Sequence, residues 1–302
     1  MPIIEIEEVS KLYGFGDATT VALDGVSLSI DKGEFIAVMG PSGSGKTTLM
    51  NLIGLLDKPT HGTYKLNSRN VSRLPKLRLA KIRRDNIGFI FQSFNLISKL
   101  TAVENVALPL AYKGMRQSKR LKTADNVLKQ VGLEDRDSYL PSQLSGGQMQ
   151  RVSIARALVN NPNIIIADEP TGNLDSVSAR VVMELLSDIH KLGNTVVMVT
   201  HNPSLTRYAD RIIYMLDGTI VYDEASTVGE IPTRIKNAIE ALRKSNDDEK
   251  LANVSAMMEE MPEVIPAKKS KRRKGRKKNS KRKNSKRAKL SRGTNPKKPG
   301  AK

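Results

Sequence analysis

The fold is decided by one stretch, Gly40-Pro41-Ser42-Gly43-Ser44-Gly45-Lys46-Thr47, which fits the pattern G-x-x-x-x-G-K-[S/T]. A β-rich run at residues 34–39 precedes it, and residues 47–56 follow with apolar side chains at helical spacing. Glycines let backbone N–H groups turn around phosphate oxygens, and the following helix directs its positive end at them. The pattern predicts Lys46 at the β- and γ-phosphates and the Thr47 hydroxyl on Mg²⁺. A Gly/Ser linker that matches by chance is the alternative, and the strand-before, helix-after context argues against it.

A second group of candidate residues follows a buried strand. Residues 163–167 form a continuous apolar run that is typical of a parallel strand, and Asp168 and Glu169 come directly after it. Asp168 suits the shell of Mg²⁺, and Glu169 suits a general base that polarises the attacking water. A strand that simply ends in solvated acids is the alternative. Beside the phosphate-binding loop, the two carboxylates are interpreted as the second half of one site.

A third motif is Leu144-Ser145-Gly146-Gly147-Gln148, in which two glycines open a helical pattern. It predicts another phosphate cradle at a helix N-terminus, with the Ser145 hydroxyl added. One nucleotide does not easily need two such cradles from one chain. Over residues 3–225 the sequence resembles the ATP-binding-cassette (ABC) ATPases, whose signature is this LSGGQ pentapeptide and whose three motifs occur in this order.

The resemblance implies roles for further residues. Gln92 matches the glutamine that contacts Mg²⁺ and senses the membrane partner, Asp175 matches a residue at the dimer interface, and His201 matches the switch histidine at the γ-phosphate. Tyr13 resembles the aromatic that stacks on adenine, although Phe15 lies two residues away and a core role for Tyr13 stays open. The implied catalytic residues are Glu169, His201 and Gln92, and the implied metal ligands are Thr47, Gln92 and Asp168. The implied nucleotide-binding residues are Tyr13, Gly40, Pro41, Ser42, Gly43, Ser44, Gly45, Lys46, Thr47, Thr48, Ser145, Gly146, Gly147, Gln148 and Asp175, with ATP and Mg²⁺ bound.

The sequence at residues 91–96 and 171–176 is similar to that of the ATPases of lipoprotein release, macrolide-type export and cell division. The resemblance implies an ATP-hydrolysing subunit that forms a homodimer and drives a separate membrane permease, in export or lipoprotein release. It also implies a cytoplasmic location, peripheral on the inner face of the membrane. A soluble ABC-type ATPase that acts on ribosomes or RNA is an alternative, although such proteins usually carry two cassettes in one chain. A P-loop kinase is a third reading, against which the signature argues.

The net charge of +19 is confined to one end of the chain. Residues 268–302 hold 19 Lys and Arg without an acidic residue, so the remaining 31 basic and 31 acidic side chains cancel. The tail also lacks aromatic residues, which leaves attraction to anionic lipid or nucleic acid, or a purely solubilising role. We expect this segment to be disordered, because a block of like charge without apolar residues cannot offset chain entropy.

Strand and helix patterns alternate along the chain. Strands are predicted at residues 3–9, 26–30, 34–39, 86–91, 163–167 and 195–200, with a hairpin at 211–222 around Asp217-Gly218; helices are predicted at 47–56, 125–130, 149–159 and 178–192. The fold class is therefore α/β. The resemblance implies a P-loop NTPase (RecA-like) core with a mostly parallel sheet, an N-terminal antiparallel β part and an inserted helical subdomain. The expected domains are an ATPase domain at 1–228 with the helical insert at about 95–159, a short amphipathic helix and linker at 229–266, and the polybasic tail at 267–302.

Three absences limit the classes of protein. The chain has no Cys, which excludes disulfides, thiolate metal sites and cysteine nucleophiles. Its first residues are acidic and alternating, unlike a signal peptide, and no apolar run approaches the roughly 20 residues of a membrane-spanning helix. A soluble, cytoplasmic chain is expected.

Overall fold

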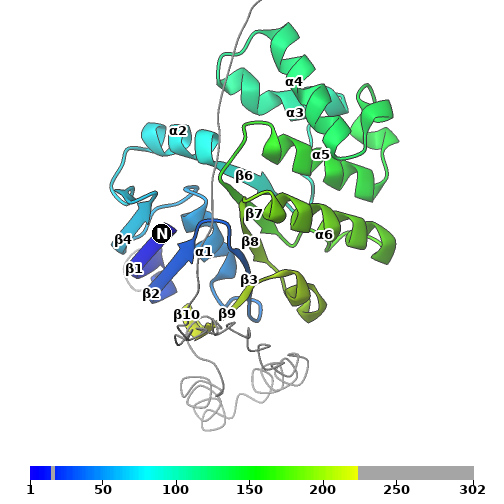
Figure 1. The fold of residues 1–302 in the computed structure, drawn as a ribbon. Helices are drawn as coiled ribbons and strands as arrows, with labels where there is room; N and C mark the ends of the chain where they lie inside the picture. Colours follow the sequence, from blue (N-terminus) through cyan, green and yellow to red (C-terminus); the bar gives the residue numbers. More distant parts are fainter. Residues whose placement is uncertain (15–17, 224–302) are drawn as a thin grey trace, which may run out of the picture. The chain divides into compact units, whose positions relative to one another are not determined.

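The computed structural model describes residues 1–14 and 18–223, which contain both strands and helices (Figure 1). The strands are β1 Pro2–Tyr13, β2 Thr20–Asp31, β3 Phe35–Met39, β4 His61–Leu66, β5 Arg69–Asn70, β6 Ile87–Ile90, β7 Ile164–Asp168, β8 Thr195–Val199, β9 Arg211–Leu216 and β10 Thr219–Asp223. The α-helices are α1 Lys46–Ile53, α2 Lys76–Asn86, α3 Ala102–Tyr112, α4 Gln117–Gln130, α5 Gly146–Leu158 and α6 Ser176–Lys191. Short 3₁₀ helices are η2 Glu134–Arg136, η3 Pro141–Gln143 and η4 Pro203–Tyr208.

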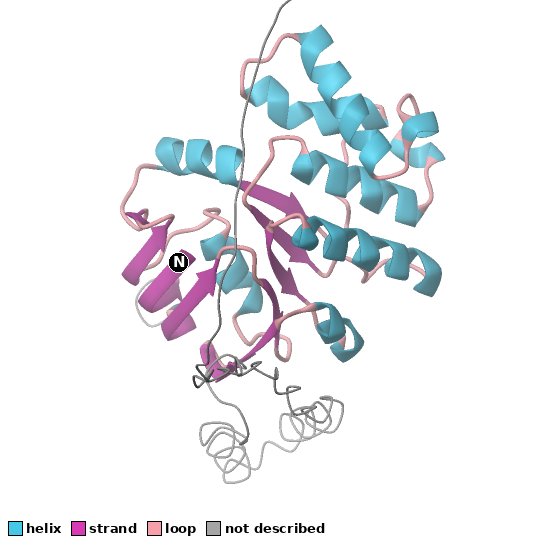
Figure 2. Ribbon diagram, viewed as in Figure 1, coloured by secondary structure: helices cyan, strands magenta, loops and turns pink. Residues whose placement is uncertain are grey.

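The strands form two sheets, drawn in magenta in Figure 2. The larger has the order β10-β9-β3-β8-β7-β6, and its neighbours from β9 to β6 are parallel, while β10 pairs antiparallel with β9. The smaller has the order β2-β1-β4-β5 and is antiparallel. The predicted α/β class, with a mostly parallel sheet and an N-terminal antiparallel part, is confirmed.

Both faces of the parallel sheet are buried. In β3, Ile36 and Val38 pack into the core shared with α1 and the smaller sheet, whereas Phe35 and Ala37 pack into the core beneath α3 to α6. Alternate side chains of a strand point to opposite faces, so a strand covered on both faces is apolar at every position. This explains the continuous apolar runs of β3, β7 and β8, whose residues are almost all buried.

The strand order brings together the loops that carry the candidate functional side chains. β8 lies between β3 and β7, and all three run in the same direction. Because the carboxyl ends of parallel strands meet at one edge of a sheet, the segments after these three strands are neighbours. They carry the loop 40–45, the pair Asp168 and Glu169, and His201.

Most elements expected from the sequence are confirmed, and several bounds differ. The helix expected at 47–56 ends at Ile53, because Gly54 terminates it and Leu55 adopts a left-handed φ of 55°. The helical stretch expected at 95–159 consists of α3, α4 and α5 with 3₁₀ turns between the last two. β4, β5 and α2 were not expected. The helix predicted in 229–266 and the tail at 267–302 lie outside the described residues, so these predictions stay untested.

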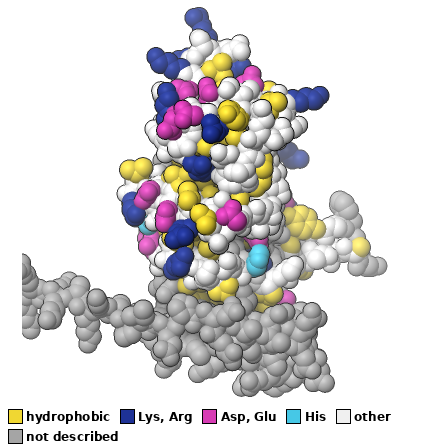
Figure 3. Space-filling view, turned by 90° about the vertical axis from the view of Figure 1, so that its right-hand side faces the viewer, with side chains coloured by type: hydrophobic (Ala, Val, Ile, Leu, Met, Phe, Trp, Pro, Cys, Tyr) yellow, Lys and Arg dark blue, Asp and Glu magenta, His cyan; other side chains and the backbone are white. Residues whose placement is uncertain are grey.

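The surface of the described part carries charges of both signs. Acidic and basic side chains are interspersed on the face shown in Figure 3. This agrees with the cancellation of charge over residues 1–267. None of the helices in residues 1–14 and 18–223 combines the length and apolarity needed to cross a bilayer.

Candidate functional site

The loop after β3 owes its shape to glycines that no other residue could replace without strain. Gly40, Gly43 and Gly45 have φ angles of 146°, 78° and 95°. A Cβ at Gly40 would lie 2.2 Å from the Met215 carbonyl oxygen, and one at Gly45 would lie 2.6 Å from that of Ala22. Such a loop turns its backbone N–H groups in one direction and leads into the N-terminus of α1, which forms an anion site.

Lys46 begins α1 and is partly buried. Its Nζ donates to the Pro41 carbonyl at 2.6 Å and lies 3.4 Å from the Ser44 Oγ. Burial lowers the pKa of Lys46, and the charges of Glu169 and Asp168 oppose that shift. A group of anionic phosphates would restore the lost stabilisation of the ammonium. The lysine is therefore held at the loop, close to carbonyl and hydroxyl partners that a phosphate can displace.

Two carboxylates, those of Asp168 and Glu169, lie close enough to Lys46 to affect its pKa. Burial raises the pKa of Asp168, the charge of Glu169 adds to the shift, and Lys46 opposes it. Glu169 has a left-handed φ of 44°, and its N–H donates to the Val199 carbonyl at 2.9 Å. Its Oε1 lies 2.6 Å from Nδ1 of His201, which joins a carboxylate after β7 to an imidazole after β8. A strained non-glycine backbone at such a point is typical of a functional residue.

These groups border one cavity of about 730 Å³, which is in the range of ligand sites. Its lining includes the predicted residues Gly40, Pro41, Ser42, Gly43, Gly45, Lys46, Thr47, Thr48, Asp168, Glu169 and His201. Thr20, Val21 and Ala22 of β2 and Val199 also line it. The β2 residues carry no motif, so sequence reasoning missed them. The glycine loop, the half-buried Lys46 and the facing carboxylates fit a polyphosphate bound with a divalent cation.

The remaining predicted residues lie elsewhere within the described part of the chain. Ser44 is buried beneath the loop, and its carbonyl accepts from the Gly218 N–H at 3.2 Å. Gln92, Tyr13, Asp175 and the signature residues 145–148 do not line the cavity in this part of the chain. The predicted set thus falls into one group around the cavity and a second group at the starts of α5 and α6, while Gln92 and Tyr13 lie apart from both.

The signature residues form the start of α5. The Ser145 Oγ accepts from the Gln148 N–H at 3.3 Å, and Gln148 Oε1 accepts from the Ser145 N–H at 2.8 Å, which is a capping box. A Cβ at Gly147 would lie 2.6 Å from the Ser178 Oγ of α6. Asp175 caps α6 by accepting from the Val177 and Ser178 N–H groups. A hydrogen bond with the Ser178 side chain, followed by these backbone bonds, holds the pKa of its carboxyl below its usual value. The starts of α5 and α6 therefore lie against each other, and neither lines the cavity.

Gln92 follows β6 and packs on the loop that comes after Glu169. The Asn173 Nδ2 donates to the Gln92 carbonyl at 3.1 Å. A Cβ at Gly172 would lie 2.6 Å from the Gln92 Nε2, so a larger residue there would have to displace the Gln92 side chain. The glutamine thus lies beside the loop that follows Glu169 and does not line the cavity.

Tyr13 ends β1 and is anchored through its hydroxyl. It donates to Asp57 Oδ2 at 2.8 Å, and Asp57 Oδ1 accepts from Lys11 Nζ at 2.8 Å. The Lys11 Nζ lies 4.8 Å from the centre of the Tyr13 ring. Burial, followed by Asp57, raises the pKa of Tyr13, and a hydrogen bond with Thr48 opposes the shift. Since Thr48 lines the cavity, the tyrosine lies at its margin, with 42% of its surface exposed.

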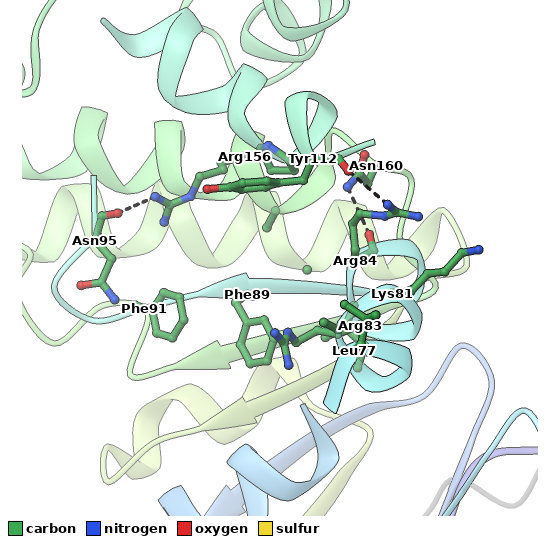
Figure 4. Close-up of a pocket in the computed structure, with 15 residues that line it drawn as sticks. Leu77, Lys81, Arg83, Arg84, Phe89, Phe91, Asn95, Tyr112, Arg156 and Asn160 are labelled. Atoms are coloured by element: carbon green, nitrogen blue, oxygen red, sulfur yellow. Dashed lines mark hydrogen bonds between the residues drawn. The ribbon is translucent and has the colours of Figure 1, made fainter. Parts of the chain in front are cut away.

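A second cavity of about 700 Å³ is a groove between α2, β6, α3 and α5 that the sequence did not indicate (Figure 4). Phe89 and Phe91 stack along its floor with ring centres 5.5 Å apart. Leu77 and Tyr112 border it and are 85% and 75% exposed. Exposed apolar side chains around a groove are typical of an interaction surface.

A family model described as ABC transporter matches residues 23–172. The macrolide export ATP-binding/permease protein MacB of Mannheimia succiniciproducens is 50% identical over 223 residues, which are 74% of this chain and 35% of that protein. The uncharacterized ABC transporter ATP-binding protein YvrO of Bacillus subtilis is 46% identical over 226 residues, which are 75% of this chain and 99% of that protein. The chain thus spans about a third of the MacB relatives it matches.

Solved structures give the same result. The dimeric structure of MJ0796, described as a bacterial ABC transporter cassette, has a TM-score of 0.68 and 49% identity over 73% of this chain and 97% of that one. A post-hydrolysis dimer of MJ0796 bound to ADP and Pi also has a TM-score of 0.68, with 48% identity over the same shares of both chains.

Proposed function

The chain belongs to the ABC transporter family, and from this we propose that it is an ATP-hydrolysing subunit that drives a separate membrane permease. The observation that carries the proposal is the cavity in which Lys46 and the glycine loop face Asp168, Glu169 and His201. Groups suited to binding phosphate and to accepting a proton thus border the same space. MJ0796, a protein of similar sequence and fold, is described as a dimer bound to ADP and Pi.

The proposed reaction is attack of water on the γ-phosphorus of ATP. The backbone N–H groups of the loop and Lys46 would bind the phosphates, and Thr47 and Asp168, which line the cavity, would hold Mg²⁺. Gln92 lies outside the cavity and would join them only after its side chain turns toward it. Bound Mg²⁺ neutralises developing charge on the phosphate oxygens. Glu169 Oε2 accepts a proton from the attacking water. As the water oxygen bonds to the γ-phosphorus, the bond between the γ-phosphorus and the oxygen of the β-phosphate breaks. ADP and phosphate leave, and His201 Nδ1 keeps the Glu169 carboxylate oriented through its 2.6 Å contact.

A second copy of the chain would complete each site. The start of α5 presents Ser145, Gly146 and Gly147 outside the cavity of its own chain, although a capped helix N-terminus with two glycines suits phosphate binding. In a head-to-tail pair, each cavity would be covered by this segment of the partner. Asp175, at the neighbouring start of α6, would lie at the same interface.

Mixing two inactive variants tests the shared site. Lys46→Ala removes a phosphate ligand from one side of each site, and Ser145→Arg blocks the other side. Heterodimers contain one site with both defects and one intact site, so partial ATPase activity is expected on mixing. Heterodimers that form and stay inactive would contradict independent shared sites.

We further propose that the groove of Figure 4 receives a cytoplasmic segment of the permease. The MacB relatives are described as ATP-binding/permease proteins, and this chain matches only about a third of them. The exposed Leu77 and Tyr112 would be covered by an apolar segment of that partner. Binding there would hold the ATPase at the inner face of the membrane, and export or lipoprotein release is the proposed process.

The absence of native Cys makes this contact testable by crosslinking. A maleimide crosslinker on Leu77→Cys should capture a co-purifying permease. Leu192, which is also 85% exposed but follows α6, supplies the control Leu192→Cys. Equal crosslinking from both positions would contradict docking in the groove.

For residues 268–302 we propose attraction to anionic lipid, since each Lys or Arg near such a surface contributes about 1 kcal/mol. Truncation after Pro266 should leave ATP turnover nearly unchanged and reduce retention on anionic liposomes at low salt. Binding of RNA instead, with a steep salt dependence, would favour the ribosome-directed alternative.

A further inference from the structure

Arg156 holds the turn that follows Gln92. It lies near the end of α5, and its Nη2 donates to the Phe94 carbonyl at 2.8 Å, while Nη1 donates to the Asn95 carbonyl (Figure 4). Burial lowers the pKa of Arg156. These hydrogen bonds, with a third from Nη2 to the Ser153 Oγ at 3.4 Å, replace much of the hydration that the guanidinium loses on burial.

The turn needs such a partner because of its backbone conformation. Phe94 and Asn95 have φ angles of 61° and 50°, both in the left-handed region. For a non-glycine residue this region is costly, and two in succession are rare. Their carbonyl groups point toward the same guanidinium, whose planar fork can bond both at once. A lysine has no such fork.

The turn is joined to the residues of the ATP site. The Phe94 N–H donates to the Phe91 carbonyl at 3.1 Å, which closes the chain around Gln92. The Gln92 carbonyl accepts from Asn173, and its side chain packs on Gly172 in the loop after Glu169. A change in the turn would therefore displace Gln92 relative to that loop.

The same helix also holds the loop after Glu169. Gln150 of α5 is fully buried, and its Nε2 donates to the Pro170 carbonyl at 2.8 Å. Gln150 and Arg156 thus connect α5 to both loops, while its first residues form the signature. A single helix, α5, therefore carries the proposed phosphate contact of one site at its start and is hydrogen-bonded to two loops of the other site.

We propose that Arg156 is a positioning residue for ATP hydrolysis, which keeps Gln92 in register with the catalytic loop by fixing the left-handed turn at Phe94 and Asn95. This rests on the proposed ATPase function. Arg156 itself does not act on the nucleotide. Because Asn95 and Arg156 both line the groove, a segment bound there would press on the same turn.

Arg151 is a matched control within the same helix. Its Nη1 donates to two carbonyl oxygens, those of Val131 and Gly132, each at 3.0 Å. Like Arg156, it loses hydration through burial, which lowers its pKa. It differs in holding a turn of the helical insert rather than the turn after Gln92, so Arg151→Ala separates a general loss of packing from a loss of positioning.

The first test is amide hydrogen exchange of the full chain without nucleotide. Arg156→Ala and Arg156→Lys should speed exchange of the Phe94 and Asn95 amides by at least about tenfold, since the turn loses its clamp. Arg151→Ala should speed exchange near Gly132 and leave residues 92–96 unchanged. Unchanged exchange at 92–96 in both Arg156 variants would overturn the proposal.

The second test is ATPase activity against Mg²⁺ concentration. Loss of a residue that orients a ligand or metal typically costs about 10–100-fold, so kcat should fall in that range in Arg156→Ala and half-activation should need more Mg²⁺. Adding Arg156→Ala to Gln92→Ala should cause little further loss, because both act through one residue. If Arg156→Ala melts at the same temperature as Arg151→Ala and keeps the wild-type kcat and Mg²⁺ dependence, Arg156 has a merely structural role. A wild-type protein without ATPase activity would instead contradict the proposed ATPase function. The exchange result would still show whether Arg156 fixes the turn at Phe94 and Asn95.

Discussion

At the scale of single residues, Glu169 is the group on which the proposed chemistry depends. It is held by the Val199 carbonyl through its backbone and by His201 through its side chain. Glu169→Gln keeps the shape of the side chain and removes its basicity. We expect ATP binding to persist and turnover to fall by about 10²–10⁴, the usual contribution of a positioned base. Single-turnover hydrolysis of labelled ATP measures it, and wild-type turnover would remove Glu169 from the mechanism.

Asp168 has a cost to stability that the proposed metal would relieve. Burial and Glu169 raise its pKa above the ordinary 3.8, so the folded chain binds a proton more readily than the unfolded chain. Stability is therefore lost as pH rises from 3.8 through the raised folded value. Asp168→Asn should raise the free energy of unfolding of the nucleotide-free protein at pH 8, and with it the melting temperature. The gain should be less than about 1 kcal/mol, because solvent screens a half-buried group.

The difference between Asp168→Asn and wild type should shrink as pH approaches 4, and the variant should lose Mg²⁺-dependent nucleotide binding. Differential scanning fluorimetry across pH follows the first effect and equilibrium binding the second. A variant that is less stable than wild type at pH 8 would mean that the attraction to Lys46 outweighs burial.

At the scale of elements, segments with a continuous apolar run or a clear turn motif were predicted well, and segments with few apolar residues were missed. β7, β8 and the β9–β10 hairpin have continuous apolar runs or an Asp-Gly turn, and Asp217 and Gly218 do have left-handed φ angles. α2 buries only Leu79 and carries many basic residues, so it has little helical periodicity in apolar side chains. β4 and β5 pair at the edge of the small sheet, where exposed positions need not be apolar.

The candidate site divides in the same way. Residues within a motif, such as Lys46 and Glu169, were identified because backbone geometry and chemistry impose their types at fixed spacing. The β2 residues that line the cavity and the residues of the groove were not identified, since segments far apart in the sequence form both. The Arg156 clamp has no signature either, because its acceptors are backbone carbonyls, which any residue supplies.

The capping box of α3 should contribute to the stability of the helical insert. The Thr101 Oγ1 accepts from the Glu104 N–H at 3.3 Å, and Glu104 Oε2 accepts from the Thr101 N–H at 2.9 Å. Thr101→Ala should cost about 1 kcal/mol, or about 2–4 °C in melting temperature. Thr123→Ala is the control, since that hydroxyl only donates to Lys119 within α4. Equal melting temperatures for the two variants would show that the cap adds nothing.

At the scale of the whole molecule, the two segments that we propose to bind phosphate would contact different nucleotides. The loop after β3 borders the cavity, and the start of α5 does not, so one chain offers two half-sites. A pair of chains would unite them, and hydrolysis would separate them again. ATP-dependent association is therefore the central claim, because the cavity, the signature and the coupling to a permease all depend on it.

Light scattering during gel filtration of Glu169→Gln with Mg²⁺ and ATP tests that claim most directly. Closure should be retained while hydrolysis is blocked, so the mass should double from 33.3 kDa with ATP and remain single with ADP. Adding Ser145→Arg to this variant should keep the mass single, since the partner's phosphate contact is lost. A protein that binds ATP yet stays at 33.3 kDa, or that dimerises equally well with Ser145→Arg, would contradict the shared site.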